Sequence, residues 1–184
     1  MVDPKVVLTA AHCFTDQETG SFQSDGTDYR VTFNRYERKD DTGTDYRPVN
    51  NKEEGKGRNY IQRHPEYNST TYDNDVAIIC LNSPVNDTIK PVKLNDDDNI
   101  PETGEEFQVM GWGYTDASNT NNTKKLSNIP QIATVDYITN EACTKDPYKY
   151  TDGRITDNMM CAAAEDKDSC KGDSGIMLLL IVSY

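Results

Sequence analysis

The chain has 184 residues, of which 35% are hydrophobic and 27% charged, a balance typical of a globular protein with one substantial core or two small ones. Its 31 acidic and 19 basic residues give a net charge of -12, which repels phosphate and argues against nucleic acid or anionic membranes as partners. No apolar run is long enough to span a bilayer, and the first residues show no signal-peptide pattern.

Short runs rich in β-branched and aromatic residues recur along the chain between polar, turn-rich stretches, and they predict an all-β fold. The expected strands lie at residues 5–11, 28–36, 59–64, 75–81, 106–113 and 131–138. Two brief helical turns are also expected. One covers Thr139–Lys145, with Thr139 or Asn140 as its N-cap, and the other lies near Asp157–Ala163.

Two polar stretches interrupt this pattern. Residues 15–57 are poor in apolar side chains and are interpreted as surface loops around the expected strand at 28–36. Residues 94–106 form a polar hinge, which predicts a first subdomain at 1–98 and a second at 99–184. The hinge superficially resembles a calcium loop, but Ile100 stands where an EF-hand needs glycine, so no metal site is expected.

Five cysteines without a C-x-x-C pair, together with only two histidines, do not supply the usual zinc spacings. Disulfides are therefore the expected use, although the odd count leaves at least one thiol without a partner in the chain. Acceptor sequons for N-glycosylation occur at Asn68, Asn86 and Asn121. They fit a secreted chain, but such sequons also arise by chance in sequence rich in Asn and Thr.

The two histidines lie in different settings. His12 follows a β-branched strand and small alanines, where an imidazole can be held rigidly for general-base work, whereas His64 precedes a proline in a polar turn. Asp75 lies where a polar turn becomes an apolar strand, and a half-buried carboxylate there needs hydrogen-bond donors. Spacing alone favours a turn-capping role for Asp75, with an imidazole partner as the alternative, and Asp73 competes for either role.

Ser174 lies in the stretch KGDSG, between Gly172 and Gly175. The flanking glycines allow a sharp turn that exposes the hydroxyl, and the N–H groups of Gly172 and Ser174 could hold a developing oxyanion. The pattern is weak by itself, since most glycine-flanked serines lie in ordinary loops, and it does not match a phosphate-binding loop. Nucleophilic serine chemistry also needs a base and a carboxylate that orients the base.

Five motifs bring these residues together: VLTAAHC, YDNDVAIICL, VMGWG, ITDNMMCAA and DSCKGDSG, in this order. In them the chain resembles the trypsin-like serine proteases of the chymotrypsin fold, from about Val6 to Gly175. The resemblance implies two antiparallel β-barrel subdomains, the first carrying His12 and Asp75 and the second carrying Ser174.

The resemblance implies that His12 is the general base, that Asp75 orients it, and that Ser174 attacks the peptide carbonyl to form an acyl-enzyme, following the general template for this chemistry. The N–H groups of Gly172 and Ser174 would form the oxyanion hole. Without the resemblance, Asp168 would be interpreted as a solvated acid. The resemblance matches it to the acid of the specificity pocket and thereby predicts cleavage after Arg or Lys. Protein substrates, protein inhibitors, a zymogen precursor and an extracellular location are implied, with no cofactor.

The family pattern extends beyond both ends of the chain, so the resemblance implies two incomplete barrels and low activity of these 184 residues alone. The counterpart of Asp173 pairs in relatives with an amine made by activation cleavage. Residues 176–184 stand where the family has Gly-Pro and further strands, although this β-prone run could fill the place of the first strand.

The cysteines follow the same pattern. Cys143 and Cys161 match a local family disulfide, whereas Cys13 and Cys170 match cysteines whose partners lie outside the chain, and Cys80 has no assigned partner. A non-catalytic homologue acting as a binding or regulatory module is the alternative function. Retention of the three triad positions and Asp168 favours the endopeptidase.

Overall fold

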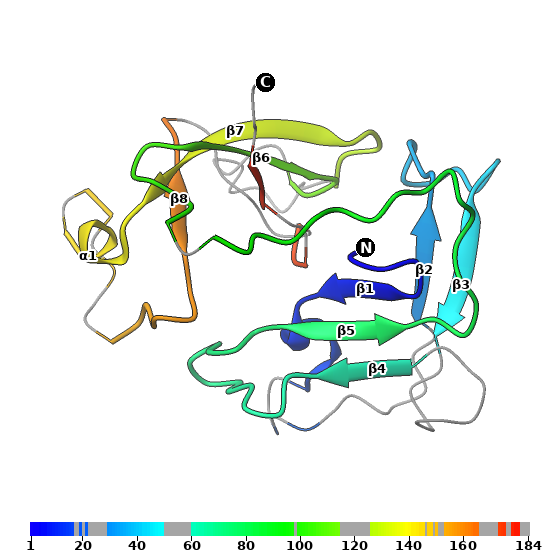
Figure 1. The fold of residues 1–184 in the computed structure, drawn as a ribbon, viewed down its shortest axis with the longest axis horizontal. Coiled ribbons are helices and arrows are strands. Elements are labelled where there is room, and N and C mark those ends of the chain that lie inside the picture. The colour runs from blue at the N-terminus through cyan, green and yellow to red at the C-terminus, as the bar shows by residue number, and fades with distance from the viewer. Residues whose placement is uncertain are drawn as a thin grey trace. The chain divides into compact units, whose positions relative to one another are not determined.

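The computed structural model describes residues 1–16, 19, 21, 29–49, 60–97, 99–114, 126–145, 147–148, 150, 153–165, 173–175 and 178–180. They fall into two compact units, Met1–Asn95 and Asp96–Tyr184, each with its own hydrophobic cluster (Figure 1). Strands dominate both units, so the expectation of an all-β fold is confirmed. The described elements are β1 (Val6–Thr9), the 3₁₀ turn η1 (Ala11–Phe14), β2 (Tyr29–Phe33), β3 (Asp45–Val49), β4 (Tyr60–Arg63), β5 (Ala77–Cys80), β6 (Glu106–Gly111), β7 (Gln131–Ile138), α1 (Asn140–Cys143), β8 (Cys161–Ala163) and β9 (Leu178–Leu180).

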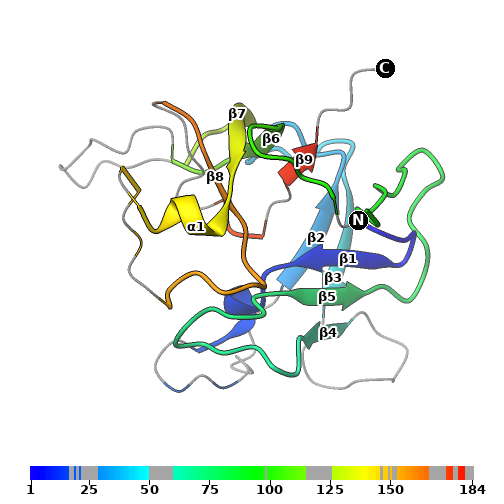
Figure 2. The same cartoon turned by 60° about the vertical axis from the view of Figure 1, so that its left-hand side comes forward.

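The first unit contains a three-stranded antiparallel sheet and a two-stranded hairpin (Figure 2). In the sheet, β5 lies between β1 and β4, and Ile79 pairs with Val7 on one side and with Ile61 on the other. Ala77 and Ile79 are buried and alternate with half-buried neighbours, because successive side chains of a strand face opposite sides. The hairpin pairs β2 with β3.

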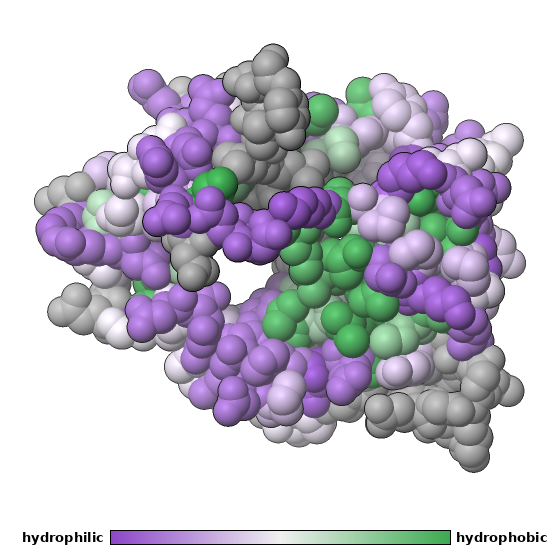
Figure 3. Space-filling model, in the orientation of Figure 1, coloured by the Kyte–Doolittle hydropathy of each residue, from purple (hydrophilic) through white to green (hydrophobic). Residues whose placement is uncertain are grey.

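The core of the first unit links the sheet and the hairpin through η1. Its buried members are Ala11, Phe14, Val49, Ala77, Ile79, Leu81 and Val85. Phe14 meets Tyr29 of β2 edge to face, with 4.9 Å between the ring centroids. Because η1 contributes two core residues, burial of this cluster also fixes the turn that carries His12. Hydrophobic surface remains visible over β1 and β5, in keeping with the half-buried residues of β1 (Figure 3).

The second unit is built on a four-stranded antiparallel sheet in the order β8-β7-β6-β9. Phe107 and Val109 of β6 are buried, and Val135 of β7 pairs with Phe107 to complete the cluster. On the other face of the same two strands, Met110 and Ile132 pair with each other and stay exposed. The strict alternation along β6 is the period-2 pattern of a sheet with one covered face.

The interpretation of residues 15–57 as loops outside the strand at 28–36 is wrong for β3. Residues Asp45–Val49 pair with β2 along their whole length, and Val49 is buried in the core. A single aliphatic residue at the end of a charged, proline-containing run gives no periodic signal, so the pairing with β2 decides the structure here. Pro48 is compatible with a strand that has one hydrogen-bonded neighbour among the described residues.

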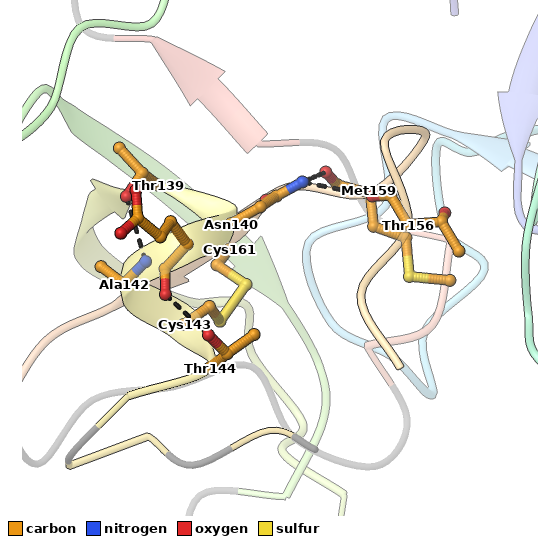
Figure 4. Close-up of a disulfide and its surroundings, with 9 residues drawn as sticks. Thr139, Asn140, Ala142, Cys143, Thr144, Thr156, Met159 and Cys161 are labelled. Atoms are coloured by element: carbon orange, nitrogen blue, oxygen red, sulfur yellow. Dashed lines mark hydrogen bonds between the residues drawn. A yellow bond between two sulfur atoms is a disulfide. The ribbon is translucent and has the colours of Figure 1, made fainter. Parts of the chain in front are cut away.

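The helical turn expected at Thr139–Lys145 is present as α1, and Thr139 is its N-cap, since its hydroxyl accepts the N–H of Ala142 at 3.2 Å (Figure 4). The turn expected near Asp157–Ala163 is wrong in its second half. Residues Cys161–Ala163 form β8, which pairs with β7. Figure 4 shows the reason: the Cys143–Cys161 disulfide ties this segment to α1, which directly follows β7.

Asn140 adds a second tie between α1 and the segment before β8. Its Nδ2 donates to the carbonyl oxygens of Thr156 at 3.2 Å and Met159 at 2.9 Å (Figure 4). One half-buried amide therefore satisfies two backbone acceptors in a stretch without regular structure. The pairing of Cys143 with Cys161, implied by the family resemblance, is present in the structure.

Removing this disulfide is expected to destabilise the second unit. The disulfide joins residues 18 positions apart, and the Cys143→Ala, Cys161→Ala double variant opens the loop between them. The greater chain entropy of the unfolded state should then lower the free energy of unfolding by about 3 kcal/mol. Chemical denaturation monitored at Trp112 measures this. Cys80→Ala, which removes a free thiol of the first unit, is the control, and an equal loss in both variants would contradict the assignment.

Candidate active site

His12 is held at the start of the short turn η1. Ala11 before it is fully buried, and Thr15 after the turn donates its hydroxyl to the carbonyl oxygen of Ala11 at 2.8 Å. Arg63 of β4 in turn donates to the hydroxyl oxygen of Thr15 at 2.7 Å. The backbone of His12 is therefore anchored on both sides, which a rigidly placed base requires.

Asp75 stands at the end of the loop that joins β4 to β5. The backbone hydrogen bonds that close the loop include one from Asn68 N–H to the Asp73 carbonyl at 3.0 Å and one from Tyr72 N–H to the Asn68 carbonyl at 2.8 Å. Tyr72 and Asn74 have φ of 61° and 55°, a left-handed conformation that non-glycine residues adopt at a cost of about 1–3 kcal/mol each. The strained residues lie directly before Asp75, where the loop leads into β5.

Both carboxylate oxygens of Asp75 bind His12. Oδ2 lies 2.7 Å from Nδ1 of the imidazole, and Oδ1 accepts the backbone N–H of the same residue at 2.8 Å. Because a carboxylate can only accept, the neutral imidazole that makes this bond has its proton on Nδ1 and its lone pair on Nε2. The two side chains are 28% and 24% exposed, so the pair lies at the surface of the unit with partial shielding from water. A base of this kind can take a proton at Nε2.

The competing residues lie elsewhere in the same loop. Asp73 accepts the N–H of the neighbouring Asn74 at 3.1 Å, and His64 accepts the N–H of Glu66 at Nδ1 at 3.2 Å. Both bonds are local turn contacts. Of the two acids weighed from the sequence, Asp75 is thus the one that the structure brings to His12.

The surroundings of the His12 imidazole include Tyr72 and Cys13. The Tyr72 ring meets it edge-on, with centroids 5.9 Å apart, and Cys13 Sγ lies 3.8 Å from Nε2. Burial raises the pKa of the Cys13 thiol, and the negative charge of Asp75 raises it further. The thiol therefore stays protonated at neutral pH and is a poor nucleophile in spite of its position.

In the second unit, Ser174 is exposed and is followed by Gly175 at φ 84°, a conformation that favours glycine. The preceding Asp173 is half-buried and accepts the N–H of Gly113 at 2.7 Å. Its carboxylate fills the space in which a Cβ on Gly111 or Gly113 would lie. Because Gly111 and Gly113 have no side chains, they leave a space, here called the seat, which the Asp173 carboxylate occupies. The sequence motif did not reveal this role.

Filling this seat is expected to displace the Ser174 loop. In Gly113→Ala the new methyl group would overlap the Asp173 carboxylate. Overpacking of this kind typically lowers the free energy of unfolding by about 1–3 kcal/mol. A double-mutant cycle with Asp173→Ala, read by chemical denaturation, measures the coupling. We expect Gly113→Ala to cost much less once Asp173 is alanine, and an unchanged cost would contradict the steric explanation.

The remaining predicted site residues, Asp168 and Gly172, lie outside the described residues, as does Cys170. Within the described ranges, no three side chains of His, Cys, Asp or Glu gather closely enough to hold a metal ion. Cys13 and Cys80 are free thiols in this part of the chain. None of its helices has the length and apolar character needed to cross a membrane.

Comparison with known proteins gives one consistent family. The model of the trypsin family matches residues 1–178. Trypsin 5G1 of Aedes aegypti is 37% identical over 119 residues, which cover 62% of this chain and 42% of that protein. Trypsin delta of Drosophila erecta is 31% identical over 182 residues (93% and 58%), and kallikrein 1-related peptidase b3 of Mus musculus is 30% identical over 182 residues (95% and 62%). The chain spans about half the length of the curated relatives it matches.

Proposed function

This chain belongs to the trypsin family of serine proteases, and we propose on that premise that it acts as a serine endopeptidase. The observation that carries the proposal is the pair of hydrogen bonds that His12 donates to the Asp75 carboxylate, because they hold the imidazole in the tautomer that a general base needs. Ser174, exposed in its glycine-flanked turn, is the proposed nucleophile. The two compact units are proposed to be the two barrel subdomains of the family.

In the proposed reaction, Nε2 of His12 takes the proton of Ser174 Oγ while this oxygen attacks the peptide carbonyl carbon. The electron pair of the carbonyl moves to its oxygen, which accepts hydrogen bonds from the N–H groups of Gly172 and Ser174. The C–N bond then breaks, the leaving amine takes the proton from His12, and the acyl group stays on Ser174. Water repeats the sequence and releases the acid, while Asp75 stabilises each transient imidazolium.

The proposed specificity is for Arg or Lys before the cleaved bond, with Asp168 as the pocket acid. The net charge of -12 supports this choice, because it attracts basic segments of a substrate. Protein or peptide substrates and protein inhibitors are the proposed partners, at an extracellular location like that implied by the family.

Asp168→Asn tests the specificity. Loss of one partner of a buried ion pair costs about 2–5 kcal/mol, so kcat/KM for Arg and Lys peptides should fall by about 30- to 4,000-fold. Peptides that differ only in the residue before the cleaved bond measure this in the mature protein. Asp166→Asn, in the same acidic run, is the matched control. A wild-type preference for an apolar residue would contradict the proposal.

The function itself is tested by covalent labelling. A fluorophosphonate should label Ser174 with one group per molecule, and His12→Ala should abolish the labelling because the serine loses its base. A folded protein that neither reacts nor cleaves peptides would favour the alternative, a non-catalytic homologue that binds other proteins.

A further inference from the structure

Two of the glycosylation sequons lie in the described part of the chain, and both are presented in the same way. Asn68 and Asn86 are exposed, as are the hydroxyl residues Thr70 and Thr88 two positions later. Asp87 between the second pair is exposed as well, whereas Ser69 between the first pair is half-buried. A bulky, solvated glycan needs its Asn at the surface, so the exposure of Asn68 and Asn86 separates these two sequons from a chance match in a core.

The side-chain amides are also oriented alike. Oδ1 of Asn68 accepts the N–H of Thr70 at 2.9 Å, and Oδ1 of Asn86 accepts the N–H of Thr88 at 3.0 Å. Since a backbone N–H needs an oxygen as its acceptor, these bonds fix which way each amide points. Nδ2, the atom that carries an N-linked glycan, takes no part in these bonds, and both asparagines are exposed.

We propose that Asn68 and Asn86 carry N-linked oligosaccharides, and that the glycan on Asn68 shields the loop that holds Asp75 from protein-sized partners. The inference rests on the extracellular location in the proposed function, because the modification requires the secretory pathway. It assigns to Asn68 a covalent ligand in addition to its part in closing the loop.

The shielding follows from where Asn68 lies. Its carbonyl accepts the N–H of Tyr72, and its N–H donates to the carbonyl of Asp73. The ring of Tyr72 in turn meets the His12 imidazole. A glycan on Asn68 is thus attached to a residue that is hydrogen-bonded to Tyr72, which in turn contacts His12, the proposed base. Asn86 lies after β5, beside Val85, whose N–H bonds to Pro4, and its glycan has no such neighbour among the described contacts.

The modification is tested by secreting the chain from a eukaryotic host and treating it with an amidase that converts each glycosylated Asn to Asp. Peptide mass spectrometry should find the conversion at Asn68 and Asn86. Thr70→Ala should lose it at Asn68 alone and Thr88→Ala at Asn86 alone, whereas Thr70→Ser should keep it. Asn68 recovered without glycan in the secreted wild type would overturn the proposal.

The shielding is tested by digestion with chymotrypsin in a Ser174→Ala background, which prevents self-cleavage. Cleavage after Tyr72, which is 45% exposed, should become several-fold faster in Thr70→Ala than in Thr70→Ser, and Thr88→Ala should not change it. Equal rates in Thr70→Ala and Thr70→Ser would overturn the shielding. Neither readout uses the activity of the chain, so failure of the proposed protease function would be recognised separately.

Discussion

Replacing Ser174 by alanine is expected to lower kcat by roughly a million-fold, the loss typical of a nucleophile that acts as one unit with its base. The substitution removes only an exposed hydroxyl oxygen, so the fold should be unchanged. What is lost is the covalent route: without Oγ no acyl-enzyme forms, and the residual rate comes from substrate binding and the proposed oxyanion donors. Cleavage of an Arg peptide by the mature protein measures the effect.

The matched control is Ser127→Ala. Ser127 lies in the same unit, and its hydroxyl donates to the carbonyl of Ile129. Its loss should change stability slightly and kcat very little. Substantial turnover by Ser174→Ala at an unchanged level of purity would rule out the acyl-enzyme mechanism proposed above.

The strands that the sequence predicts are those with a strong local signal. The runs DVAIICL and QIATVDYI are rich in β-branched residues, and β5 and β7 lie within them. β3 and β8 are not predicted because contacts with other parts of the chain determine their conformation. β3 has one buried apolar residue and follows β2, while three residues of β8 are placed by β7 and by the disulfide to α1.

The candidate site divides in the same way. The sequence identifies His12 and Asp75 as residues able to do the chemistry, but their contact joins positions 63 apart, and spacing cannot predict such a contact. On local grounds a cap for its own turn is the favoured role for Asp75. In the structure both of its oxygens bind His12 instead. The seat formed by Gly111 and Gly113 is equally long-range, since it serves Asp173 at a separation of 60 positions from Gly113.

Replacing Asp75 by asparagine is expected to lower kcat by about 10,000-fold while leaving the backbone in place. In the native pair each Asp75 oxygen accepts one hydrogen bond. One comes from the backbone N–H of His12 and the other from its Nδ1–H. Asparagine has only one oxygen. If this oxygen stays with the backbone N–H, the amide NH₂ faces Nδ1, and Nδ1 must become the acceptor. The proton then resides on Nε2, which can no longer take one from Ser174.

The same substitution has a second consequence, which needs no catalysis. The Asp75 charge is the second cause, after burial, of the raised pKa of Cys13. A raised pKa means less thiolate at a given pH, so removing the charge should lower this pKa and speed alkylation of Cys13 at mildly alkaline pH. Asp73→Asn, in the same loop, should leave kcat and alkylation unchanged. If it changed both as Asp75→Asn does, the effects would belong to the loop as a whole and not to the carboxylate that binds His12.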